Sequence, residues 1–299
     1  MPSTPAAAAA NLREGLAIEI KGLSVAYGNQ RAVDSIDLEV FCGEVVGFLG
    51  PNGAGKTTTM RALLDLLRPD AGTLRVFGED PRKAGGALRA RLGFLPGDLA
   101  LFPGLSGRQN LDLFANLYGG RSQARDAVLE RLGFRRDALD WKLRKYSTGM
   151  RQMIGIAVAF QHEPDLLVLD EPTTGLDPLV REAFLQLIRD RASAGRTVLF
   201  SSHVLAEVED CADRVALIDR GRLLAVEDME TFRRRLPRKV ILRRANGEVE
   251  VIPFQGSPRD LVQALENCGL DDAVDVEVRP AVLNEVFRAI IREGQEDSP

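Results

Sequence analysis

The sequence predicts an α/β fold with a mixed-sheet core, a helical subdomain and a small C-terminal α+β domain. Short apolar strands alternate with amphipathic helices over residues 16–236, which is typical of a mainly parallel sheet with both faces covered. A mostly helical stretch at about 98–161 interrupts this alternation, and the pattern changes again over 237–292. The alanine-rich segment 1–15 is expected to be a disordered tail, and 293–299 a polar tail.

The predicted core contains short apolar strands and two clear helices. A helix is expected over 55–67, because Met60, Leu63 and Leu67 recur at helical spacing on one side. A second helix is expected over 179–192. The strands are expected at 17–28, 35–40, 44–50, 166–170, 197–202 and 214–219.

The helical subdomain is expected to contain helices at 108–120 and 122–134, with glycine at the end of the first and at position 133 of the second. Apolar residues line one face of the first helix, and such a face is more often core than docking surface. These residues are Leu111, Leu113, Phe114 and Leu117.

In the C-terminal domain, residues 238–254 predict a β-hairpin. Its turn, Asn246-Gly247, suits the type I′ geometry that joins two strands through two residues. Two helices and a short strand are expected to complete this domain.

Composition and charge exclude several classes of protein. The 299 residues are 45% hydrophobic, with 39 Lys and Arg against 43 Asp and Glu, a net charge of −4. This balance gives no bulk electrostatic basis for binding nucleic acid, so no nucleic-acid partner is expected. Three widely spaced cysteines match neither a disulfide framework nor a zinc site, which fits a reducing cytosol. No run of 18 apolar residues occurs, so for work at a membrane something other than a spanning helix would have to hold the chain there.

A phosphate-binding loop is predicted between the strand at 44–50 and the helix at 55–67. Two glycines five positions apart, followed by Lys56 and Thr57, let backbone N–H groups curl around phosphate oxygens at a helix N-terminus. Lys56 is expected to reach the β- and γ-phosphates, and the Thr57 hydroxyl to bind Mg²⁺. The alternative is a glycine turn with an incidental lysine. The nucleotide-binding residues expected here are Gly50, Pro51, Asn52, Gly53, Ala54, Gly55, Lys56, Thr57 and Thr58.

Two carboxylates follow the buried strand at 166–170, at the sheet edge where ligands of α/β proteins bind. Asp170 suits a role beside Mg²⁺. Glu171 is then placed to orient and deprotonate a water molecule. Acidic pairs at strand ends can also serve only as helix caps, but the phosphate-binding loop favours catalysis.

Together with these motifs, several others make the sequence resemble the nucleotide-binding subunits of ATP-binding cassette (ABC) transporters. The run 146–152, YSTGMRQ, resembles the family's signature motif LSGGQ about twenty residues before Asp170. Gly175-Leu176-Asp177 resembles the family's D-loop, and His203 the switch histidine. Tyr27 lies where the family has an aromatic residue that stacks on adenine. The resemblance covers residues 17–221.

The resemblance implies how ATP and Mg²⁺ would be used. Two such domains meet head to tail, so that each ATP lies between the phosphate-binding loop of one and the signature of the other. The signature residues that would act on the partner-bound ATP are Ser147, Thr148, Gly149 and Met150. Lys56, Glu171 and His203 would be the catalytic residues, Thr57 and Asp170 the metal ligands, and Asp177 the D-loop residue. Simpler interpretations are a packing aromatic for Tyr27 and a helix cap for Ser147.

Two departures from the family pattern stand out. Thr148 replaces the first glycine of the signature's pair, and a β-branched residue disfavours positive φ, so the loop is expected to be altered. Gly97 stands where the family usually has a glutamine beside Mg²⁺, and Asp98 is a candidate substitute. The remaining histidine, His162, is interpreted as solvated surface.

The function predicted from these observations is ATP hydrolysis that powers an exporter. The C-terminal segment resembles the end of ATPases that serve drug, polyketide and lipid export, so the cargo is expected to be hydrophobic or drug-like. Partners would be a second ATPase subunit, in a homodimer, and separate transmembrane permease subunits on the cytoplasmic face of the cell membrane. The alternatives are a soluble regulatory ABC ATPase that acts on nucleic acid or ribosomes, and a low-turnover nucleotide switch.

Overall fold

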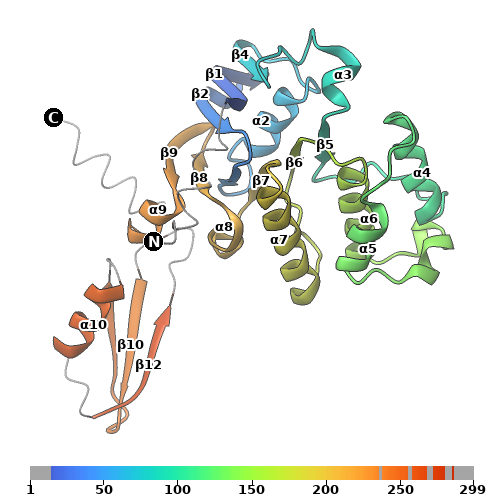
Figure 1. Cartoon of the computed structure of the whole chain (residues 1–299). Coiled ribbons are helices and arrows are strands. Elements are labelled where there is room, and N and C mark those ends of the chain that lie inside the picture. Colours follow the sequence, from blue (N-terminus) through green and yellow to red (C-terminus); the bar gives the residue numbers. More distant parts are fainter. Residues whose placement is uncertain (1–14, 236–237, 255–257, 268–271, 280–284, 286–299) are drawn as a thin grey trace, which may run out of the picture. The chain divides into compact units, whose positions relative to one another are not determined.

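A computed structural model describes residues 15–235, 238–254, 258–267, 272–279 and 285 (Figure 1). The chain divides into two compact units, Met1–Val226 and Glu227–Pro299. This division lies before the boundary expected after residue 236, because the helix α9 (Met229–Arg235) groups with the second unit. The expected polar tail, and all but one residue each of the expected N-terminal tail and of the last expected helix, lie outside the described residues.

A six-stranded sheet forms the centre of the first unit. Its strand order is β5-β6-β7-β3-β8-β9, and the first five strands run parallel. The parallel sheet predicted from alternating strands and helices is thus confirmed. The strands are β3 (Val45–Leu49), β5 (Leu92–Leu95), β6 (Leu166–Leu169), β7 (Thr197–Ser202), β8 (Arg214–Asp219) and β9 (Arg222–Asp228).

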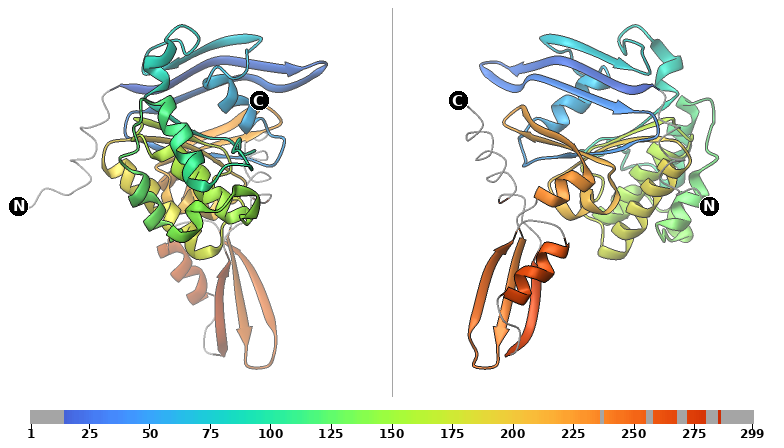
Figure 2. Two further views of the ribbon diagram at one scale, coloured as in Figure 1. Left: turned by 90° about the vertical axis from the view of Figure 1, so that its right-hand side faces the viewer. Right: turned by 60° about the vertical axis from the view of Figure 1, so that its left-hand side comes forward.

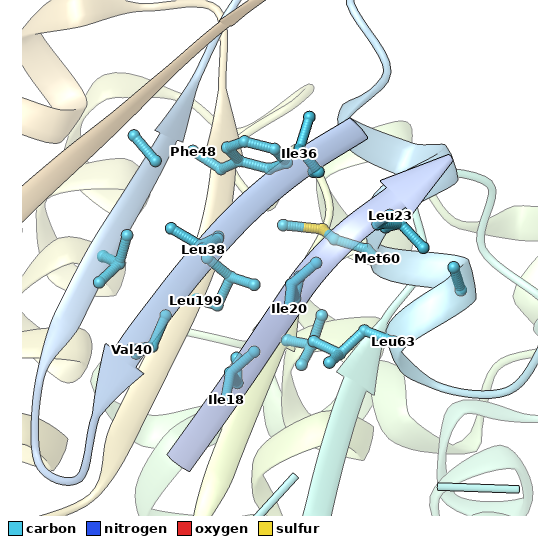
Figure 3. Packing of buried hydrophobic residues seen from close by; sticks show 14 of the residues in the cluster. Ile18, Ile20, Leu23, Ile36, Leu38, Val40, Phe48, Met60, Leu63 and Leu199 are labelled. Carbon is cyan, nitrogen blue, oxygen red and sulfur yellow. The ribbon is translucent and has the colours of Figure 1, made fainter. Parts of the chain in front are cut away.

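An antiparallel sheet of order β2-β1-β4 is layered over this parallel sheet (Figure 2). Apolar residues on its inner face, such as Ile20 and Leu38, pack with Phe48 of β3 and Met60 of the helix α2 in one core cluster (Figure 3). Burial of this cluster fixes the position of α2 between the two sheets. The elements are β1 (Leu16–Tyr27), β2 (Gln30–Phe41), β4 (Ala71–Val76) and α2 (Lys56–Leu63).

The helical subdomain leaves the sheet after β5 and returns at β6. Its first helix begins with a capping box, in which Ser106 and Gln109 bind each other's backbone N–H groups. Leu111 is buried, as expected, but Leu113 and Leu117 are 38% and 72% exposed, so the core interpretation of this face was wrong for them. The helices are α4 (Gly107–Leu117), α5 (Arg125–Arg131), α6 (Thr148–Phe160) and the 3-10 turns Arg136–Asp140 and Leu143–Lys145.

Further helices of the first unit are α3 (Gly85–Arg89), α7 (Pro178–Ser193) and α8 (Leu205–Cys211). The helix predicted at 179–192 is therefore confirmed as α7. No helix in the described part of the chain combines the length and the apolar character needed to cross a membrane.

The second unit contains a three-stranded antiparallel sheet of order β11-β10-β12. The predicted hairpin is confirmed, but the type I′ turn is wrong: Gly247 has φ +85°, whereas Asn246 does not adopt positive φ. The Asn246 side chain instead accepts the Glu248 N–H at 2.8 Å, a bond that holds a wider loop. The elements are β10 (Arg238–Arg244), β11 (Val249–Phe254), α10 (Pro258–Asn267) and β12 (Ala273–Arg279).

His162 is fully buried, so its interpretation as solvated surface was wrong. Its ring stacks on Tyr118, with centroids 3.8 Å apart, and Nε2 lies 2.9 Å from the carbonyl oxygen of Leu92 in β5. Burial lowers the pKa of His162 from its ordinary value of 6.5, and the charges of Arg121 and Arg191 act in the same direction. The folded protein therefore holds a neutral imidazole where the helical subdomain rejoins the sheet.

This burial predicts a pH-dependent contribution to stability. Because the pKa of His162 is lower in the folded state, the contribution of its neutral ring to the free energy of unfolding is complete above pH 6.5 and is lost as pH falls below that value. His162→Phe retains an aromatic ring against Tyr118 but cannot titrate. Between about pH 7 and pH 5, the unfolding temperature of the unmodified protein is expected to fall more than that of the variant. Parallel unfolding temperatures over this range, measured by circular dichroism, would contradict the assignment.

Candidate active site

The loop between β3 and α2 has the backbone geometry of a phosphate cradle. Gly53 and Gly55 adopt φ of +80° and +110°, which other residues rarely reach. A Cβ at position 55 would lie 2.6 Å from the Ala32 carbonyl oxygen, and one at position 50 would lie 2.4 Å from that of Ile218. Only glycine fits at these two positions. The loop therefore places its backbone N–H groups beside the N-terminus of α2, where they can donate hydrogen bonds to an anion.

Lys56, the first residue of α2, points back into this loop. Its ammonium donates to the carbonyl oxygens of Gly50, at 2.6 Å, and Pro51, at 3.2 Å, and lies 3.1 Å from Glu171 Oε1. The side chain is only 5% exposed. The sequence placed Lys56 and Glu171 115 positions apart, and the parallel pairing of β6, β7 and β3 brings them together.

Asp170 follows β6 and binds two hydroxyl groups. Thr57 Oγ1 donates to Asp170 Oδ2, and Ser201 Oγ donates to Oδ1, both at 2.7 Å. The residue is 2% exposed. Asp170 and Thr57 therefore lie in contact, as expected, and Ser201 adds a contact to Asp170 that the sequence did not predict.

Glu171 has an unusual backbone conformation at the end of β6. Its φ is +47°, its N–H donates to Ser201 Oγ at 2.8 Å, and its Oε2 lies 2.7 Å from His203 Nδ1. Left-handed backbone at a residue other than glycine costs free energy, and such residues cluster at active sites. Glu171 is therefore held between Lys56 and His203, with one oxygen toward each.

A pocket of about 570 Å³ opens over the loop and α2. Tyr27, at the end of β1, lines it with a half-exposed ring, and Glu171 lines it as well. Four lining residues were not predicted. Gln30 and Arg31 could have been found as neighbours of Tyr27 in the β1–β2 hairpin, but nothing in the sequence pointed to Arg220. The lining residues are Tyr27, Gln30, Arg31, Ala32, Pro51, Asn52, Gly53, Ala54, Gly55, Lys56, Thr57, Thr58, Glu171 and Arg220.

The predicted signature residues lie apart from this pocket, at the start of α6. Ser147 is the N-cap, and its hydroxyl accepts the Met150 N–H at 3.1 Å. Thr148 is the first helical residue and does not adopt positive φ, so the strain expected of a β-branched residue is absent there. The helical backbone accepts a β-branched residue there. Gly149 follows Thr148 in the first turn.

Two further predicted positions are placed by the structure. Asp177 caps α7, where its carboxylate accepts the Val180 N–H at 3.0 Å. Gly97 lies beside the acidic site, since a Cβ there would be 3.2 Å from Asp170 Oδ2. Asp98 is exposed, and its role as a substitute for the missing glutamine stays a prediction.

This site is that of a P-loop nucleoside triphosphatase: a glycine-rich loop lies at a helix N-terminus, a lysine lies inside the loop, and two carboxylates lie at the end of a strand in the same sheet. The sequence pattern of the ABC transporter family matches residues 33–174. The daunorubicin resistance ATP-binding protein DrrA3 of Streptomyces coeruleorubidus is 39% identical over 91% of this chain and 94% of its own length. This chain therefore belongs to the ATP-binding subunits of the ABC transporter family, and it is an ABC ATPase.

Other relatives and solved structures agree with this assignment. The bacitracin transport ATP-binding protein BcrA of Bacillus licheniformis is 40% identical over 69% of this chain and 68% of its own length. A solved ATP-binding subunit of an ABC transporter covers 73% of this chain and 92% of its own, with 31% identity and a TM-score of 0.66. A dimeric ATP-binding cassette in a post-hydrolysis state with ADP and Pi shares the fold at 22% identity, covering 71% of this chain and 98% of its own with a TM-score of 0.65.

Proposed function

We propose that this chain is the ATP-hydrolysing subunit of an exporter and that the pocket over α2 holds its ATP. The observation that carries the proposal is that Lys56, Thr57 and Glu171 line this one pocket, with Asp170 bound to the Thr57 hydroxyl beside it. Tyr27 lines the same pocket, where it would stack on the adenine ring. The triphosphate would then extend toward the loop N–H groups and Lys56.

The present geometry suggests what ATP binding does to Glu171. Lys56 now lies 3.1 Å from Glu171 Oε1, and phosphate oxygens would compete for the same ammonium group. Glu171 would then keep its contact with His203 and be released to accept a hydrogen bond from water. As the water oxygen attacks the γ-phosphorus, Glu171 takes up its proton, and the bond from phosphorus to the β-phosphate oxygen breaks. His203 would orient Glu171 and contact the γ-phosphate.

The residues beside the pocket fit Mg²⁺. The described residues include no group of three or more His, Cys, Asp or Glu side chains that could hold a metal by themselves. Mg²⁺ does not need such a group, because it usually keeps waters and binds one or two protein oxygens together with substrate phosphates. Thr57 Oγ1 and Asp170 Oδ2 supply such oxygens. When bound, the ion would neutralise charge on the β- and γ-phosphates.

ABC ATPase subunits dimerise and work with permease components, and we propose a homodimer for this chain. Ser147, Thr148, Gly149 and Met150 lie apart from the chain's own pocket, as expected of residues that act on a partner's nucleotide. Ser147 would offer its hydroxyl, and α6 the positive end of its dipole, to that nucleotide's γ-phosphate. The dimer would sit on the cytoplasmic face of the membrane, held by separate permease subunits.

The names of the relatives support a hydrophobic or drug-like cargo. They include daunorubicin resistance and bacitracin transport proteins. The experiment co-expresses this chain with candidate permeases and measures ATP-driven uptake of daunorubicin into inside-out vesicles. Uptake that requires both proteins and ATP, and that fails with Glu171→Gln, is expected. ATP hydrolysis that no co-purified membrane protein changes would contradict a transport role.

A further inference from the structure

The loop that follows Glu171 is held by the helix α6. Gln152, in the second turn of α6, donates from Nε2 to the Pro172 carbonyl oxygen at 2.7 Å. The Gln152 residue is only 5% exposed, so water does not replace this bond easily. Pro172 directly follows Glu171, and proline has no backbone N–H. The hydrogen bond therefore fixes the one backbone hydrogen-bonding group of the residue after the proposed catalytic base.

A second contact joins α6 to the same loop three residues later. A Cβ at position 175 would lie 2.8 Å from the Thr148 Cγ2 atom, and one at position 149 would lie 2.8 Å from the Gly175 carbonyl oxygen. The first turn of α6 and the loop thus meet with no space for another methyl group. Because protein interiors have low compressibility, a displacement of the first turn of α6 would also displace this loop.

The backbone of Glu171 needs such support. Its φ of +47° is a sparsely populated conformation for a residue with a side chain. Ser201 holds the N–H of Glu171 on one side, at 2.8 Å, and Gln152 holds the carbonyl of the following residue on the other. These two bonds hold the peptide before Glu171 and the peptide after Pro172, and the carboxylate stays aimed at Lys56 while both peptides keep this orientation.

We propose that Gln152 is a positioning residue for ATP hydrolysis: by holding the Pro172 carbonyl, it keeps the Glu171 carboxylate directed at the attacking water. This inference rests on the proposed role of Glu171 as the base. Gln152 itself would touch neither ATP nor the water. Its loss should therefore lower kcat and leave nucleotide affinity unchanged.

The test replaces Gln152 with methionine, which has a similar length and volume but cannot donate to Pro172. A displacement of about 1 Å at a catalytic group costs on the order of 10²-fold in rate, so a fall in kcat of roughly 10- to 100-fold is expected. The Kd for ATP, measured by equilibrium titration of the full chain, should stay within about twofold of the value for the unmodified protein. A change of that size is well below the tenfold that corresponds to about 1.4 kcal/mol of binding free energy. Gln152→Asn, whose shorter side chain cannot reach Pro172, should give the same result and serves if the methionine variant does not fold.

Gln161→Met is the matched control. Gln161 is also buried, at the end of the same helix; its Nε2 donates to the Leu111 carbonyl oxygen at 3.2 Å and its Oε1 accepts from Arg125 Nε at 3.1 Å. It precedes β6, whereas Glu171 follows the other end of that strand. The unfolding temperature of Gln161→Met should fall as that of Gln152→Met does, but its kcat should equal that of the unmodified protein. Equal kcat values for the two methionine variants would overturn the proposal and reduce Gln152 to a structural residue. An unchanged rate in Glu171→Gln would instead overturn the proposed base, so the two failures are distinguishable.

Discussion

Glu171→Gln is expected to lower the rate of ATP hydrolysis by about 10²- to 10⁴-fold, the range that a general base contributes. Glutamine keeps the size of the side chain and can still bind His203, but it cannot take up a proton from water. ATP binding should survive, because the phosphate-binding loop and Tyr27 are untouched. Phosphate release measures the rate. Light scattering in the presence of ATP should show a dimer that persists, because the γ-phosphate proposed to join the two subunits is not removed.

The control for this variant is Glu182→Gln, which removes one carboxylate from an exposed position of α7. Its rate of phosphate release should equal that of the unmodified protein, since a single surface charge affects stability little. Unchanged turnover in Glu171→Gln would remove Glu171 from the mechanism. It would also leave the left-handed backbone at this residue without a catalytic reason.

The parts of the site that could be predicted from sequence are those encoded by local patterns. A buried strand followed by glycines and Lys56 specifies its own turn, because few other residues tolerate positive φ or close backbone approach. A second buried strand ending in Asp170 specifies the sheet edge on which the carboxylates lie. Parallel pairing then brings the two motifs together, and the hydrogen bond from Thr57 to Asp170 is the result.

The parts that could not be predicted depend on contacts between segments far apart in the chain. Nothing near His162 shows that its ring is covered by Tyr118, 44 positions away, or that Leu92 accepts its hydrogen bond. The bond from Gln152 to Pro172 is hidden in the same way. The exposure of Leu117 is the opposite case: helical periodicity marks an apolar face but does not say whether another element covers it.

Lys56→Ala is expected to raise the Kd for ATP by roughly 10- to 150-fold, because hydrogen bonds to a charged group contribute about 1.5–3 kcal/mol. The ammonium group is held at the loop by the carbonyls of Gly50 and Pro51, and alanine leaves the backbone N–H groups there without this charged donor. AMP lacks these phosphates, and its affinity should barely change, which separates a lost phosphate contact from a collapsed loop. Lys83→Ala, at an exposed position, is the control in the same titrations. An unaltered Kd for ATP in Lys56→Ala would show that the triphosphate does not lie in this loop.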